Sequence, residues 1–170
     1  MLVVVDMQVG FLNANSLPIV DAVTHLIDAC DAKSIPTAFT RFGNEIGSPY
    51  ERLLGWTSVR QEQETALHEA FRRRDDPIIE KTFYSAFTPE FSALVSEWNC
   101  ETLLICGVST ESCVLKTAVD AFERDLRPIL VADSCASDLG PEMHRMGLEI
   151  IQVLIGKDQI MTTEELIRQL

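Results

Sequence analysis

The sequence predicts an α/β fold in which a mostly parallel, doubly wound sheet is covered by helices. Two observations support this fold class. Short apolar runs of strand length alternate with amphipathic stretches of helical period along the chain, which is the pattern of βαβ units. The length of 170 residues suits one domain, 1–170, and neither a linker-like stretch nor an internal repeat divides it.

In the first part of the chain, an apolar run at 1–6 predicts a buried strand, and apolar residues recur at helical spacing over 18–33. A second strand is expected at 35–40, with Pro36 at its entry. Residues 42–58 are rich in glycine and aromatic residues. We expect a long loop there, which is a lid or an oligomer interface.

The remainder of the chain continues the alternation. A helix is expected over 60–74, where the basic run at 72–74 would complement the dipole of its last turn. Thr88 is expected to cap another helix, with Pro89 at its first position. The remaining expected elements are strands at 77–81, 102–106 and 128–132, helices at 111–125 and 141–149, and a last strand from 159 followed by a helix opening near 163.

The composition restricts the class of partner. The net charge of −12 opposes binding to nucleic acid or to an anionic membrane, which both reward clustered Lys and Arg. The apolar run near the N-terminus is only strand-sized, so neither a signal peptide nor a membrane span is expected. Five cysteines, without zinc-like pairing, do not form a disulfide framework. We therefore expect a cytoplasmic protein with a small-molecule substrate.

Two charged residues stand at predicted strand ends, where ligands bind in this architecture. Asp6 follows four apolar residues directly; a catalytic carboxylate and a turn cap are equally open interpretations. Lys81 ends the short third strand, and alone it would be interpreted as a solvated edge charge.

Cys113 gives the sharpest signal. It follows a buried strand and a glycine turn, in the first turn of a helix that Ser109 or Thr110 would cap. Free backbone N–H groups and the helix dipole there favour the thiolate and could also stabilise an oxyanion. The alternative is a small buried hydrophobic residue, which is our interpretation of the other four cysteines.

Together these three residues could form a catalytic device. Asp6 would accept the thiol proton and later return it to a leaving amine. Lys81 would keep Asp6 ionised and add positive potential near the sulfur. The histidines suit a base poorly: His25 and His68 fall within helices, and His144 at most lines the rim.

The residues around these positions resemble the isochorismatase-like cysteine hydrolase superfamily, which includes nicotinamidases and N-carbamoylsarcosine amidohydrolases. The resemblance extends over nearly the whole chain in four ordered blocks. These are Asp6-Met7-Gln8 with Phe11, the Lys-Thr-Phe-Tyr-Ser-Ala-Phe run at 81–87, the Gly-Val-Ser-Thr-Glu-Ser-Cys-Val run at 107–114, and the Val-Ala-Asp-Ser-Cys-Ala-Ser run at 131–137 with His144 behind it.

The resemblance implies a three-layer α-β-α sandwich with a six-stranded sheet and a catalytic triad of Asp6, Lys81 and Cys113. It also implies a non-proline cis peptide between Val108 and Ser109, with the backbone N–H groups of Ser109 and Cys113 as an oxyanion hole. A homo-oligomer, a dimer or larger, is expected on the same ground.

Two departures from relatives refine the expected activity. The metal motif of nicotinamidases is missing, since residues 40–47 contain no histidine, so we expect neither metal nor other cofactor. True isochorismatases lack the nucleophilic cysteine, so Cys113 favours hydrolysis of a small amide or ureide C–N bond through a thioester. The expected substrate-binding residues are Gln8, Phe11, Arg41, Phe42, Trp56 and Tyr84.

Three alternatives remain. Asp6 could act as the general acid of vinyl-ether hydrolysis, with Cys113 a bystander. Cys113 could serve a thiol redox sensor, with Cys106 or Cys135 as partner. For Arg41, an ordinary surface charge is as plausible as a contact to a substrate carboxylate. A phosphorylatable or nucleotide-binding module is disfavoured, because Asp6 has no acidic neighbour and no phosphate-binding glycine motif is present.

Overall fold

The computed structural model describes residues 1–72 and 74–170 of the chain. Its centre is a six-stranded sheet in the order β3-β2-β1-β4-β5-β6, in which every neighbouring pair is parallel. The strands are β1 (Leu2–Val5), β2 (Thr37–Phe42), β3 (Ile78–Lys81), β4 (Thr102–Val108), β5 (Arg127–Ala136) and β6 (Ile160–Met161). The predicted fold class is confirmed.

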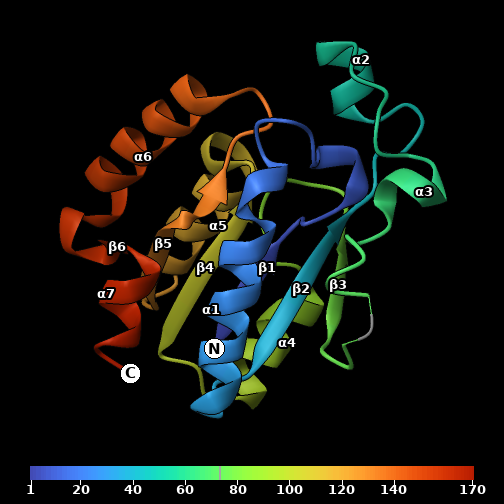
Figure 1. Cartoon of the computed structure of the whole chain (residues 1–170). Coiled ribbons are helices and arrows are strands. Elements are labelled where there is room, and N and C mark those ends of the chain that lie inside the picture. The colour runs from blue at the N-terminus through green and yellow to red at the C-terminus, as the bar shows by residue number, and fades with distance from the viewer. Residues whose placement is uncertain (73) are drawn as a thin grey trace.

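Helices cover both faces of this sheet (Figure 1). The helix α1 packs with α7 on one face, and α4 and α5 lie behind the sheet in the view of Figure 1. The helix α6 packs on α5 and on the turn that precedes it. The helices are α1 (Val20–Ala32), α2 (Pro49–Leu54), α3 (Glu62–Thr65), α4 (Pro89–Glu97), α5 (Leu115–Phe122), α6 (Pro141–Ile155) and α7 (Thr163–Ile167).

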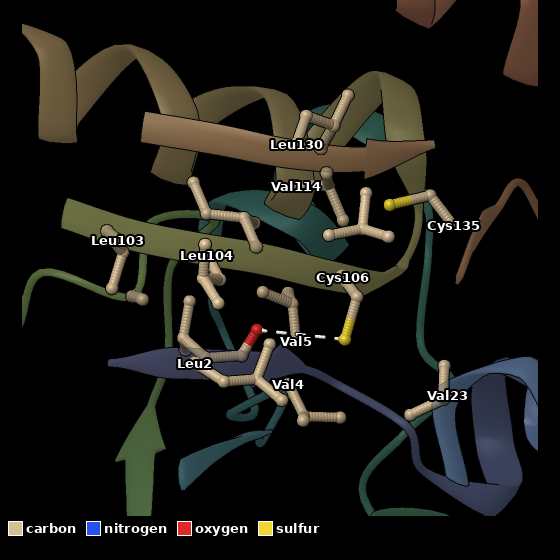
Figure 2. Close-up of a cluster of buried hydrophobic side chains, with 14 of the residues drawn as sticks. Leu2, Val4, Val5, Val23, Leu103, Leu104, Cys106, Val114, Leu130 and Cys135 are labelled. Atoms are coloured by element: carbon tan, nitrogen blue, oxygen red, sulfur yellow. Dashed lines mark hydrogen bonds between the residues drawn. The ribbon is translucent and has the colours of Figure 1, made fainter. Parts of the chain in front are cut away.

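The core lies between the central strands and the helices. All four residues of β1 are buried, and β4 is buried from its second residue onward. Figure 2 shows Cys106 within this core, beside aliphatic side chains of both strands. Each such aliphatic side chain contributes about 1.5–3 kcal/mol when it leaves water. The strand order and this burial together place β1 and β4 at the centre of the sheet, so the ends of these strands are held rigidly.

The helix expected over 60–74 is wrong. Only Glu62–Thr65 is helical, and Ala66 returns to an extended backbone. Leu67 and Phe71 are both buried, so their spacing of four imitated a helical face although the chain there runs irregularly over the core. Of the basic run at 72–74, Arg73 lies outside the described residues.

Three smaller corrections concern element bounds. The loop expected over 42–58 contains α2, which Ser48 caps with its side chain and Gly55 ends in a left-handed conformation. The helix expected over 111–125 begins as one π-helical turn, Thr110–Val114, before α5. The helix expected at 141–149 continues to Ile155. The predicted cap of α4 by Thr88 is confirmed, since its side chain accepts a hydrogen bond from the Phe91 N–H.

The segment between 44 and 58 is closed at its base. The side-chain amide of Asn44 donates to the carbonyls of Trp56 (3.0 Å) and Ser58 (3.1 Å), and its backbone N–H donates to Val59 (2.9 Å). The segment therefore leaves and re-enters the body of the protein at one point. Within the described residues, no helix has the length and apolar character required to cross a membrane.

Candidate active site

Three side chains from three strand ends meet at the carboxyl edge of the sheet. Asp6 follows β1, Lys81 ends β3, and Cys113 lies in the π-helical turn after β4. The Lys81 Nζ lies 2.6 Å from Asp6 Oδ2 and 3.5 Å from Cys113 Sγ. The side chains of Asp6 and Lys81 are completely buried, and Cys113 is 6% exposed. The three residues singled out in the sequence are thus in mutual contact.

Asp6 is oriented from two sides. The Thr40 hydroxyl, on the neighbouring strand β2, donates to Asp6 Oδ1 at 2.6 Å and accepts from the Asp6 backbone N–H at 3.1 Å. Lys81 holds the other carboxylate oxygen. Asp6 also has a positive φ of 48°, so the chain turns sharply as it leaves β1. Both carboxylate oxygens are therefore fixed in direction.

Lys81 has a full set of acceptors. Besides Asp6, its ammonium donates to the backbone carbonyls of Phe83 and Tyr84, each at 3.1 Å. Burial alone would lower the pKa of Lys81, but the charges of Asp6 and Cys113 and the hydrogen bonds to them together outweigh burial, and the pKa is raised. The ammonium also donates to Cys113 Sγ at 3.5 Å, so four acceptors share its three protons. Lys81 is a fixed positive charge at neutral pH.

The surroundings of Cys113 favour the neutral thiol. Burial and then the charge of Asp6 raise the pKa of the Cys113 thiol above its usual range, although Lys81 opposes them. The helix-end position, which by itself favours the thiolate, is thus opposed by burial and by the charge of Asp6. The expected side-chain cap is wrong: Ser109 donates to Asp138, and the Thr110 hydroxyl lies 2.7 Å from His144 Nδ1.

The turn before Cys113 depends on a glycine. Gly107 has a φ of 114°, and a Cβ on it would lie 2.1 Å from the carbonyl oxygen of Val5. The following peptide bond, between Val108 and Ser109, is cis, where the resemblance places it. Among the described residues, no hydrogen bond uses the backbone N–H of Ser109, so this donor remains available to a ligand.

A cavity of about 340 Å³ opens beside Cys113. Four expected substrate-binding residues line it: Phe11, Phe42, Trp56 and Tyr84. Ser109, Ser112 and Cys113 of the nucleophile turn also line the cavity. The other lining residues were not predicted from the sequence: Tyr50, Leu54, Glu111, Asp138 and Leu139. Tyr50 stands among the loop aromatics and could have been found; Asp138 follows the Val-Ala-Asp-Ser-Cys-Ala-Ser run at 131–137 without any distinguishing pattern.

The aromatic rings form one connected wall. Phe11 stacks on Trp56 with ring centroids 6.0 Å apart. Tyr50 meets Phe42 and Tyr84 edge-on, at 5.2 and 5.1 Å. Burial raises the pKa of Tyr50, so its hydroxyl stays protonated. The wall is apolar and suits a planar ligand.

Two expected substrate contacts are wrong. The Gln8 amide is buried and donates to the carbonyls of Phe42 (2.8 Å) and Thr65 (2.9 Å), while its oxygen accepts from the Phe42 N–H (2.7 Å). It has no free group for a ligand and fastens the end of β2. Arg41 pairs with Glu80 on the surface of β3 and does not line the cavity.

The other reactive residues lie apart from this contact. All five cysteines are free thiols, and burial raises the pKa of Cys30 to about 11 and of Cys135 to about 12. Burial also lowers the pKa of His144. Within the described part of the chain, no group of three or more His, Cys, Asp or Glu side chains is arranged to hold a metal ion.

Known proteins resemble this chain over most of its length. The model of the isochorismatase domain matches residues 1–165. Enterobactin synthase component B of Escherichia coli (strain K12) is 29% identical over 178 residues, which cover 98% of this chain and 61% of that protein. The chain thus spans less than two thirds of this relative.

Two solved structures are similar in fold. An isochorismatase-like hydrolase from Alkaliphilus metalliredigens superposes with a TM-score of 0.86 at 20% identity, covering 99% of this chain and 97% of the other. The pyrazinamidase of Pyrococcus horikoshii in complex with zinc superposes with a TM-score of 0.79 at 26% identity, covering 95% and 97%.

Proposed function

The chain belongs to the isochorismatase family of hydrolases, and we propose that it cleaves the C–N bond of a small amide or ureide with Cys113 as covalent nucleophile. One observation carries this proposal: a single ammonium, Lys81, contacts both the Asp6 carboxylate and the Cys113 sulfur. The contact lies beside an aromatic cavity that Cys113 itself lines.

In the first half of the proposed reaction, Asp6 removes the thiol proton as the sulfur attacks the substrate carbonyl carbon. The raised pKa of Cys113 fits a proton transfer that accompanies attack. Lys81 offsets the negative charge that passes from carboxylate to sulfur. The developing oxyanion would accept hydrogen bonds from the backbone N–H groups of Ser109 and Cys113.

The tetrahedral intermediate then collapses. The C–N bond breaks, the leaving nitrogen takes the proton from Asp6, and ammonia or an amine departs from a thioester on Cys113. In the second half, Asp6 deprotonates a water molecule that attacks the thioester. The C–S bond breaks, the acid departs, and the proton on Asp6 returns to the sulfur.

The residues at the end of β2 and directly after it do not fit a metal site of the nicotinamidase type. Arg41 pairs with Glu80, and Phe42 packs in the aromatic wall. The side-chain amide of Asn44 donates both of its hydrogen bonds to backbone carbonyls. No carboxylate or imidazole set converges there among the described residues. The proposed steps therefore use only the charges of Asp6 and Lys81.

A second candidate is vinyl-ether cleavage, because the matching family model is named for isochorismatase. In that reaction Asp6 would protonate the substrate and Cys113 would take no covalent part. The two candidates differ in what they require of the thiol.

The test measures ammonia release from a panel of small amides and ureides after treatment with a chelator. We compare the unchanged protein, Cys113→Ala and the control Cys100→Ala, whose thiol lies just before β4 and away from the site. Release that is lost only in Cys113→Ala supports the proposal. Release that survives in Cys113→Ala contradicts the nucleophile, and isochorismate cleavage by that variant would favour the second candidate.

A further inference from the structure

We infer that the cavity selects substrates by charge: it favours a small amide whose non-reacting end is a cationic or N–H-bearing nitrogen group, and it rejects carboxylates. This inference rests on the proposed function, since it concerns the same cavity. It goes beyond it because nothing in the triad determines the charge of the substrate.

Two acidic residues line the cavity on the side of the nucleophile turn, Glu111 and Asp138. Glu111 Oε1 accepts a hydrogen bond from the Ser137 hydroxyl at 2.8 Å, while its Oε2 is buried without a partner. Asp138 accepts from the Ser109 hydroxyl. Within the described chain, neither carboxylate forms an ion pair, so their negative charge is compensated only by hydroxyl dipoles.

The nearby cations do not offset this charge. The lining of the cavity contains no Lys, Arg or His. Lys81 is balanced by Asp6, Arg41 by Glu80, and Arg60 by Glu51. Burial lowers the pKa of His144 by more than the charge of Glu111 raises it, so the neutral ring is favoured at pH 7. The cavity is therefore electronegative.

The aromatic wall acts in the same direction. Phe11, Phe42, Tyr50, Trp56 and Tyr84 surround the space next to the carboxylates. The faces of aromatic rings carry negative partial charge and attract cations within about 6 Å. The acidic residues and the aromatic rings would both stabilise a bound positive group, and both would destabilise a bound carboxylate.

The size of the effect follows from Coulomb's law. For charges about 8 Å apart at an effective dielectric constant of about 20 to 40, removing one carboxylate changes the dissociation constant of a charged ligand by about 5- to 30-fold. The change should weaken binding of a cation and strengthen binding of an anion.

The experiment uses three probes that share a benzamide core: 4-(aminomethyl)benzamide, benzamide and 4-carbamoylbenzoate. Their binding to Cys113→Ala is measured by calorimetry, so the result does not depend on turnover. In the same background we add Glu111→Gln or Asp138→Asn, which keep the hydrogen bonds from Ser137 and Ser109. Glu142→Gln, on the exposed side of α6, is the matched control.

We expect the cationic probe to bind most tightly and the anionic probe most weakly. Neutralising either carboxylate should change the dissociation constant of each charged probe by about 5- to 30-fold, which narrows the difference between them. The control substitution should leave these dissociation constants unchanged. Equal binding of the three probes, tighter binding of the anion, or no binding of any probe would overturn the inference. Turnover separates the two proposals: ammonia release by Cys113→Ala defeats the proposed function whatever the order of binding.

Discussion

The charge pair of Asp6 and Lys81 makes a quantitative prediction about stability. Both side chains are completely buried and lie 2.6 Å apart. In Lys81→Met, the Asp6 carboxylate would remain buried with neutral side-chain partners, the Thr40 hydroxyl and the Cys113 thiol, and without a cation. Removing one partner of a buried pair costs about 3–5 kcal/mol, which for a chain of this size lowers Tm by about 6–20 °C.

The double variant Asp6→Asn/Lys81→Met separates charge from packing. It leaves no buried charge at the positions of this pair, so we expect it to recover most of the lost stability while remaining inactive. Urea denaturation at pH 7 measures the free energy of unfolding of both variants, and ammonia release measures their activity. If Lys81→Met is as stable as the unchanged protein, the reasoning is refuted. It is also refuted if the double variant is no more stable than Lys81→Met.

Three further predictions follow from the site. Because burial raises the pKa of Cys113, iodoacetamide should alkylate it slowly at pH 7 and faster as the pH rises above 9; a rate already at its plateau near pH 7 would contradict this. Gly107→Ala should cost more than about 3 kcal/mol of unfolding free energy, since its Cβ would overlap a carbonyl of β1, whereas Gly43→Ala, which has open space, should change it little in the same urea titration. Thr40→Val should lower kcat about 10- to 100-fold through the lost hydrogen bond to Asp6 with little change in KM, so an unchanged kcat would remove its positioning role.

The sequence predicted the fold and the three central residues for a physical reason. Apolar runs that end at Asp6 and Lys81 identify strand ends, and parallel strands bring such ends to one edge. Cys113 could be recognised because a strand, a glycine turn and a helix start lie in unbroken succession. These local patterns predict a contact between residues that are far apart in the sequence.

What the sequence could not predict depends on side-chain direction and surroundings. Gln8 and Arg41 stand in the right segments, but one fastens a strand and the other pairs on the surface. The protonation of Cys113 depends on burial and on a carboxylate far away in sequence. Leu67 and Phe71 have helical spacing and yet pack from an irregular chain.

The segment that Asn44 closes at its base has a consequence for how this protein could change. Tyr50, Leu54 and Trp56, which line the cavity, all come from this one segment, while Asp6, Lys81 and Cys113 belong to the sheet and its turns. A replacement of residues 45–57 by a different loop would therefore alter which molecules enter and leave the bond-breaking groups in place. In such an arrangement, substrate specificity can change through substitutions in the segment, because these leave the catalytic side chains in place.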